Sequence, residues 1–362
     1  MSSSIPSTYK RAVFKENGAS LTLEEVRLTL PKAGEILVKV EACGVCHSDY
    51  FIQTDLLGGG FPIVPGHEII GRVAAVGKGE TLWKEGDRIG GAWHGGHDGT
   101  CMACKKGFFQ MCENEEINGM SRNGGYGEYC LLRREAAVPI PDQVNAAQYA
   151  PLLCAGVTVF NSMRHMNIPP GELVAIQGLG GLGHLAIQYA NKFGYRVVAL
   201  SRDSEKEEFA RILGAHEYVD TLREDPVAAL QKLGGASLII STAPVPEIIT
   251  PLIQGLGVMG KLLILSSEFS CRLKTFCSLG FAWVLTRLVV DIEANTVTLV
   301  RKGKSIWSWP CGHATDSEEA IAFADLHGIK CLVEEFPLER CNDAFEATMK
   351  GTVRFRSVIT MQ

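Results

Sequence analysis

The sequence predicts an α/β protein of two domains, one rich in β-strands and one built on a parallel sheet with crossover helices. The chain has 362 residues, which is enough for two domains with separate cores. Up to about Ala150 it is rich in Gly and carries short β-like runs. After Pro169-Pro170-Gly171, strand-like and helix-like stretches alternate.

Individual elements follow from the apolar runs. In the first part they predict strands at residues 36–40 and 69–76. Gly and Asp interrupt this part often, as in a β-barrel-like domain with long functional loops. In the second part we expect strands at 173–176, 196–200, 238–240 and 262–265, with helices at 184–193 and 205–213.

The composition narrows the possible partners. A net charge of -5 without an arginine-rich stripe argues against a nucleic acid or an anionic membrane as partner. The N-terminus lacks the apolar stretch of a secretory signal, and the apolar run at 279–290 is too short to span a bilayer and contains Arg287. We therefore expect a cytoplasmic protein. Its twelve cysteines should then be reduced thiols, and clustered ones indicate metal binding or catalysis.

A glycine-rich junction separates the first strand of the second part from its helix. The six residues Gly178, Leu179, Gly180, Gly181, Leu182 and Gly183 fit the pattern G-x-G-x-x-G. In this context the glycines allow a tight turn and a close approach of the backbone to a pyrophosphate, and the helix N-terminus offers free N–H groups. The junction therefore predicts a dinucleotide site, and the alternative is a glycine-rich turn without a ligand.

The end of the next strand indicates which nicotinamide cofactor binds. An acidic residue there would bind the ribose 2′-hydroxyl of NAD(H). This chain has Ser201 and Arg202, with Lys206 four residues beyond Arg202, and these groups suit a 2′-phosphate. Asp203 opposes this interpretation, and Arg202 and Lys206 could also be solvated charges at a helix start. We favour NADP(H) over NAD(H).

Two short segments near the N-terminus carry metal-ligand chemistry. They are GVCHSD, residues 44–49, and PGHE, residues 65–68. Cys46 and His67 are of the types that bind zinc best, and an open zinc site with three protein ligands polarises a substrate oxygen. The third ligand is not evident from these segments.

A second cluster has the spacing Asp98-x2-Cys101-x2-Cys104-x7-Cys112. Three cysteines so close together predict a structural zinc site, which normally takes four ligands. His94 and His97 lie nearby and are interpreted as loop residues, with His97 as the reserve candidate for a ligand.

These motifs, together with Cys154-Ala155-Gly156-Val157-Thr158 and GLGGLGH, occur in the order seen in zinc-containing medium-chain alcohol dehydrogenases. From about Tyr9 to Met361 the chain resembles that family, and most of all its cinnamyl-alcohol-type and microbial NADP-dependent branch. The resemblance implies a GroES-like β-barrel catalytic domain, residues 1–158 and 313–362, and a Rossmann-fold cofactor domain, residues 159–312. It also implies a homo-oligomer, either a homodimer or a tetramer.

The resemblance further implies the roles of individual residues. Cys46, His67 and Cys154 would bind the catalytic zinc, Glu68 could approach it, and Asp49 would orient His67. Ser48 would pass the substrate proton, and His47 would lie near the cofactor phosphates. Thr158 would pack against the nicotinamide. Arg356 would reach the cofactor phosphates, and the alternative for it is a surface arginine on a strand.

Three departures from the family are visible. Phe51 stands where many members have a histidine that completes the proton relay, so the proton would leave another way, such as through ribose and water. Asp98 stands where the first of four structural cysteines is usual, which predicts a Cys3Asp site that could also be empty. Residues 276–296 look like extra sequence, either an added helix or an unspliced intron.

The expected function is zinc-dependent hydride transfer between NADP(H) and a primary alcohol or aldehyde. One alternative is a reductase of conjugated C=C bonds within the zinc family. Another is a cofactor-binding member without catalysis, against which the intact ligands and Ser48 count.

Overall fold

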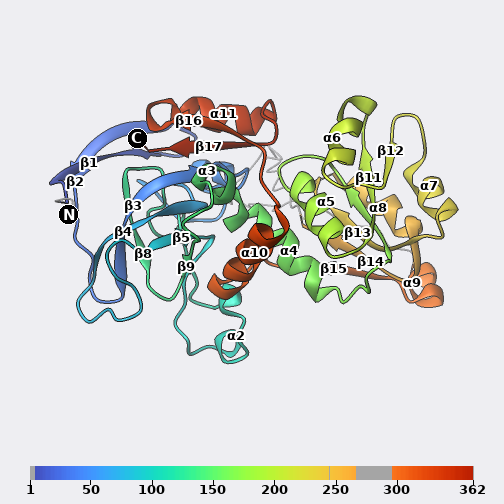
Figure 1. Ribbon diagram of the computed structural model, residues 1–362, viewed down its shortest axis with the longest axis horizontal. Helices are drawn as coiled ribbons and strands as arrows, with labels where there is room; N and C mark the ends of the chain where they lie inside the picture. The colour runs from blue at the N-terminus through green and yellow to red at the C-terminus, as the bar shows by residue number, and fades with distance from the viewer. Residues whose placement is uncertain (1–4, 244, 266–295, 362) are drawn as a thin grey trace, which may run out of the picture. The chain divides into compact units, whose positions relative to one another are not determined.

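The computed structural model describes residues 5–243, 245–265 and 296–361. They form two compact units, which Figure 1 shows with most of their elements labelled. The first unit comprises residues 1–165, 180–192 and 310–362, and the second comprises residues 166–179 and 193–309. The expected extra segment at 276–296 lies outside the described residues, except for Thr296.

The first unit is built on a mainly antiparallel sheet of seven strands. Along the sheet the order is β16-β17-β3-β4-β5-β9, and β8 also pairs with β3. The strands are β3 (Glu35–Gly44), β4 (Ile69–Val76), β5 (Arg88–Gly91), β8 (Tyr129–Arg133), β9 (Ala137–Pro139), β16 (Val333–Pro337) and β17 (Arg356–Thr360). Two further pairs are β1 (Thr8–Val13) with β2 (Thr22–Arg27), and β6 (His94–Gly96) with β7 (Glu116–Ile117).

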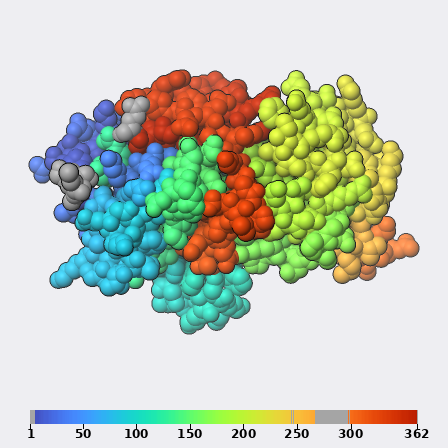
Figure 2. All heavy atoms as spheres, viewed as in Figure 1, coloured from blue at the N-terminus to red at the C-terminus, as the bar shows by residue number. Residues whose placement is uncertain are grey.

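Helices complete the first unit. They are α1 (Asp49–Gln53), α2 (Met102–Lys105), α3 (Ala146–Tyr149), α4 (Ala155–His165), α5 (Gly183–Lys192), α10 (Ala314–His327) and α11 (Cys341–Lys350). The core forms where apolar side chains of β3, β4 and β5 meet Phe345 of α11 and Ile359 of β17. In Figure 2 the turquoise atoms around residue 110 form a lobe of this unit, which is the cysteine-rich loop.

Pairing between β17 and β3 brings the C-terminal segment to the GVCHSD segment. The two strands are antiparallel, with Val358 opposite Gly44. Just beyond β3, the Val45 N–H donates to the Ser357 carbonyl over 2.9 Å. This pairing places Arg356, the first residue of β17, beside the residues that follow β3.

The second unit contains a parallel sheet of six strands in the order β12-β11-β10-β13-β14-β15. They are β10 (Leu173–Gln177), β11 (Arg196–Ser201), β12 (Glu217–Asp220), β13 (Ala236–Ser241), β14 (Leu256–Ile264) and β15 (Ser305–Ser308). Its helices are α6 (Glu207–Ile212), α7 (Pro226–Lys232), α8 (Pro246–Gly255) and α9 (Thr296–Lys302). The strand order reverses beside β10, where open parallel sheets bind dinucleotides at the carboxyl ends of the strands.

Every predicted strand is confirmed, and the one expected at 69–76 coincides with β4. The helix expected at 184–193 is α5, one residue earlier. The helix expected at 205–213 begins as a 3-10 turn, Ser204–Lys206, and continues as α6. Among the described helices, none is both long and apolar enough to cross a membrane.

Candidate active site

Four side chains from three separate segments meet inside the first unit. Cys46 follows β3, His67 and Glu68 precede β4, and Cys154 lies between a 3-10 turn, Ala150–Leu153, and α4. One potential ligand atom from each residue lies within 4.8 Å of all the others. Cys46, His67 and Glu68 are at most 5% exposed. The structure therefore brings Cys154 to the two segments that carry Cys46 and His67.

The geometry of this cluster fits zinc. The sulfurs of Cys46 and Cys154 lie 3.7 Å apart. Zinc–sulfur bonds of about 2.3 Å at tetrahedral angles would separate two sulfurs by about 3.8 Å. In addition, His67 Nε2 and Glu68 Oε2 are buried without a hydrogen-bond partner. Buried polar atoms rarely stay unpaired, so a cation is the natural partner for both.

The electrostatics of the thiol pair favour metal binding. Their mutual hydrogen bond lowers the pKa of Cys46 well below its usual value and raises that of Cys154. Burial lowers the pKa of His67, but the neighbouring Asp49 and Cys46 outweigh this effect and raise it to about 10. Without a metal, a proton on His67 therefore compensates the charges of Asp49 and Cys46, and a divalent cation would replace that proton.

Two charged groups support the cluster. Asp49 Oδ1 lies 3.5 Å from His67 Nδ1, and Asp49 Oδ2 accepts from the Cys46 N–H over 2.9 Å. Arg356 donates through Nη2 to Glu68 Oε1, and its side chain is 4% exposed. The alternative of a surface arginine is therefore wrong for Arg356. Burial raises the pKa of Glu68 to about 7, although the neighbouring Arg356 opposes this shift.

Ser48, His47 and Phe51 flank the cluster. Ser48 is the residue before α1, and its hydroxyl lies 3.4 Å from the Cys46 sulfur. His47 is exposed, with its ring 6.5 Å from that of Phe51. Phe51 lies on α1 and offers no group that transfers a proton. Thr158, on α4, donates its N–H to the Cys154 carbonyl over 2.9 Å.

The glycine-rich turn follows β10. Gly178 has a φ of +93°, which favours glycine, and its N–H donates to the Leu200 carbonyl. At the far end of the turn, Gly183 begins α5, and the Ala186 N–H donates to the Leu182 carbonyl. The backbone of Gly180 accepts from both the N–H and Nδ1 of His184.

The predicted phosphate-binding residues lie at the end of β11. Ser201 is its last residue, and Arg202 is exposed just beyond it. Lys206 donates through Nζ to the Leu179 carbonyl over 3.1 Å, which places its ammonium group beside the glycine-rich turn. Asp203, the residue that opposed a phosphate, accepts from the Glu205 N–H and so begins the following 3-10 turn.

The second cluster also has the geometry of a metal site. In Asp98, Cys101, Cys104 and Cys112, one ligand atom each lies within 4.8 Å of the others. Asp98 Oδ1 is 3.6 Å from the sulfur of Cys112 and 3.8 Å from that of Cys104. Zinc bonds of about 2.3 Å to sulfur and 2.1 Å to oxygen at tetrahedral angles predict about 3.6 Å. The distances from Asp98 therefore fit those expected of a fourth ligand.

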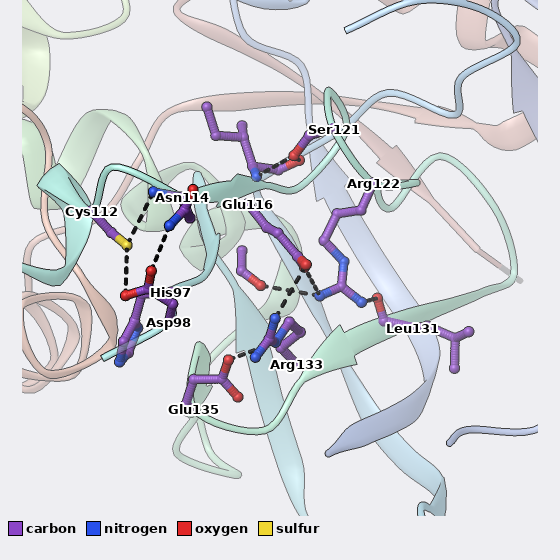
Figure 3. Close-up of polar contacts among 12 residues, drawn as sticks. His97, Asp98, Cys112, Asn114, Glu116, Ser121, Arg122, Leu131, Arg133 and Glu135 are labelled. Carbon is purple, nitrogen blue, oxygen red and sulfur yellow. Dashed lines mark hydrogen bonds and ion pairs between the residues drawn. The ribbon is translucent and has the colours of Figure 1, made fainter. Parts of the chain in front are cut away.

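Hydrogen bonds hold Asp98 in place. Its Oδ1 accepts from the Thr100 N–H over 2.7 Å, and its Oδ2 accepts from Asn114 Nδ2 over 2.6 Å. These bonds, that from Thr100 foremost, keep the pKa of Asp98 well below its usual value. Figure 3 shows the contacts of Asp98 with Cys112 and Asn114, and nearby the ion pairs of Glu116 with Arg122 and Arg133.

The two nearby histidines differ from each other. His94 is not a loop residue as expected, because it lies in β6 and is 1% exposed. His97 does lie in a loop, where its Nδ1 bonds His94 Nε2 over 3.2 Å and its ring stacks on Phe109. Since Asp98 completes the four-residue cluster, His97 is not part of it.

Sequence reasoning missed one residue beside the cluster of Cys46, His67, Glu68 and Cys154. Tyr126 donates its hydroxyl to Asp49 Oδ2 over 2.8 Å and is fully buried. A single tyrosine in a glycine-rich stretch carries no local signal of such a contact.

The fold and the site define a zinc-type medium-chain dehydrogenase. Residues 32–142 match the model of the alcohol dehydrogenase GroES-like domain, and residues 181–324 match that of the zinc-binding dehydrogenase. The chain is 78% identical to alcohol dehydrogenase patD of Penicillium expansum over 100% of both chains. It is 55% identical to alcohol dehydrogenase notN of Aspergillus sp. strain MF297-2 over 99% of both. The solved cinnamyl alcohol dehydrogenase SbCAD4 of Sorghum bicolor is 27% identical, with a TM-score of 0.83 and coverage of 98% of this chain and 97% of that one.

The chain belongs to the zinc-containing medium-chain alcohol dehydrogenase family. It is therefore an oxidoreductase with a GroES-like and a Rossmann-type domain, and it acts on small molecules with zinc and a nicotinamide cofactor.

Proposed function

We propose that this enzyme transfers a hydride between NADP(H) and a primary alcohol or aldehyde, with zinc held by Cys46, His67 and Cys154. The observation that carries the proposal is the cluster of two sulfurs 3.7 Å apart beside the unpaired His67 Nε2. We assign the zinc site to a catalytic domain, residues 1–158 and 313–362, and the cofactor to a domain of residues 159–312.

Zinc bound at this site would supply a Lewis acid for the substrate oxygen, and the nicotinamide would exchange the hydride. The protein contributes the rest. Asp49 fixes the ring of His67, and the Ser48 hydroxyl transfers the substrate proton. Glu68 adds a carboxylate beside the ligands, held by Arg356. Phe51 does not continue the proton relay.

Positive charge at the end of β11 supports NADP(H). Arg202 is exposed there, and Lys206 is fixed beside the glycine-rich turn by its bond to Leu179. Because Asp203 bonds the backbone at Glu205, its carboxylate is engaged locally. Guanidinium and ammonium groups in this position suit a 2′-phosphate. We also propose that Asp98, Cys101, Cys104 and Cys112 hold a structural zinc.

A pair of alanine variants tests the zinc mechanism. Cys46→Ala removes a proposed ligand, and Cys43→Ala removes a buried thiol of the core three residues earlier. The assay follows NADPH oxidation with aldehydes and enals, together with zinc content. We expect Cys46→Ala to lose activity and about one zinc per chain, and Cys43→Ala to keep both. Equal aldehyde reduction by the two variants would refute the mechanism, and turnover of enals alone would favour C=C reduction.

A further inference from the structure

Tyr126 connects the two segments that carry Cys46 and His67. It lies in a short stretch before β8, far in sequence from both segments, and none of its surface is exposed. Its main chain binds one segment and its phenol binds the other. This arrangement gives it a role that its position in the sequence does not indicate.

The main-chain contacts hold the turn before His67. Gly124 donates to the Val64 carbonyl over 2.7 Å, Gly125 to Gly66 over 2.9 Å, and Tyr126 to Pro65 over 3.1 Å. Three consecutive N–H groups thus bind three consecutive carbonyls. A β-carbon on Gly66 would lie 2.4 Å from the Tyr126 ring, so the turn packs directly on this ring.

The phenol holds the carboxylate that faces His67. Asp49 Oδ2 accepts two hydrogen bonds, from the Tyr126 hydroxyl over 2.8 Å and from the Cys46 N–H over 2.9 Å. The other oxygen, Oδ1, has no hydrogen-bond partner besides the near contact with His67 Nδ1 at 3.5 Å. The two donors on Oδ2 stop the carboxylate from rotating, and so direct Oδ1 toward the imidazole.

We infer that Tyr126 is a positioning residue for the catalytic metal, acting through Asp49 on His67. Outer partners that orient a ligating histidine fix its ring and raise its basicity, and losing one weakens metal binding by about 10- to 100-fold. The Tyr126 hydroxyl acts one hydrogen bond farther out than Asp49. We expect its removal to weaken zinc binding by about tenfold, the lower end of that range. The inference rests on the proposed zinc site.

Tyr126→Phe is the test, because it removes only the hydroxyl. Its matched control is Tyr189→Phe, since Tyr189 is also fully buried and donates one hydrogen bond, to the Ala320 carbonyl over 3.0 Å. The zinc-loaded full chain is dialysed against graded EDTA, and the remaining zinc is measured. Cys46→Ala lacks a proposed ligand of the site at His67, so the zinc that this variant keeps is the amount that the cysteine-rich loop retains. Melting temperatures are recorded for each variant.

The expected result is a zinc site about tenfold weaker in Tyr126→Phe and unchanged in Tyr189→Phe, although both variants lose thermal stability. If Tyr126 acts through Asp49, adding Tyr126→Phe to Asp49→Ala should weaken zinc binding by less than about twofold further. Wild-type zinc retention in Tyr126→Phe would overturn the positioning role. If Cys46→Ala retains as much zinc as the wild type, the proposed zinc site itself fails, and the positioning role fails with it.

Discussion

His184 should make this protein less stable as the pH falls below neutrality. The residue follows the glycine-rich turn on α5 and is fully buried. Its Nδ1 donates to the Gly180 carbonyl over 3.0 Å, so Nε2 is the acceptor in the neutral ring. The Cys331 sulfur lies 3.3 Å from Nε2, and the Leu332 nitrogen lies 3.4 Å from it. The ring stacks on Phe355 with centroids 4.9 Å apart. The site therefore accommodates a neutral imidazole.

The magnitude follows from the difference in pKa between the two states. Burial, with a smaller contribution from Arg356, lowers the pKa of His184 from 6.5 to about 4 in the folded protein. Between these values the unfolded chain binds a proton that the folded chain does not, so stability falls as the pH decreases. By pH 5.5 the loss is about 1.4 kcal/mol, and below pH 4 it approaches about 3.4 kcal/mol.

His184→Gln removes the titrating group and keeps a polar side chain. We expect its melting temperature to lie below that of the wild type at pH 7.5 and to approach it as the pH falls to 5.5. A change of about 1.4 kcal/mol corresponds to about 3–6 °C in a domain of this size. Thermal melts of both proteins at saturating zinc measure the difference in melting temperature. Because both proteins contain the same other titrating groups, the effects of those groups cancel in the comparison. Parallel pH profiles for the two proteins would refute the reasoning.

Three further predictions concern the sites. Arg202→Ser should lower kcat/KM for NADPH about tenfold and barely change kcat/KM for NADH. As a control, Arg196→Ser, at the other end of β11, should change neither value. Equal losses with both cofactors in Arg202→Ser would contradict the phosphate contact. Metal analysis should find that Asp98→Ser reduces zinc from about two to about one per chain, whereas Asp98→Cys keeps two. Two zinc ions per chain in Asp98→Ser would rule out the carboxylate as a ligand. Arg356→Met should lower the melting temperature more than the double variant Arg356→Met/Glu68→Gln does. The reason is that only the single variant leaves the buried carboxyl of Glu68 without its donor. Additive losses of stability in the double variant would contradict the pairing.

The elements that the sequence predicts well are those with a local signal. The strand at 69–76 is a run of β-forming apolar residues interrupted by Gly71 and Arg72, and its bounds coincide with those of β4. The four predicted strands of the second unit contain short apolar runs, bounded by turns and helical stretches. The glycine-rich turn is recognisable because a buried strand precedes it and a helix follows. In each case the signal lies within the element and its immediate neighbours.

The parts that could not be predicted depend on distant contacts. Nothing in its local sequence distinguishes Cys154 from an ordinary buried cysteine. Only the family resemblance indicates a metal ligand, and only the fold brings it beside Cys46. Arg356 could equally have been a surface residue, until the pairing of β17 with β3 brings it to Glu68. Tyr126 reaches Asp49 only because its stretch pairs with the turn before His67. Pattern and propensity carry no information about such pairings.

The two candidate zinc sites differ in the same way, because one depends on local sequence and the other on distant contacts. The cysteine-rich loop holds all its donors between Asp98 and Cys112, so its site can form from one local segment. The other cluster takes donors from loops beside β3, β4 and α4, which meet only when the sheet of the first unit is folded. A ligand that binds only the folded state adds its binding free energy to the stability of that state. Zinc at Cys46, His67 and Cys154 should therefore stabilise the whole first unit, whereas zinc at Asp98 should stabilise mainly the loop.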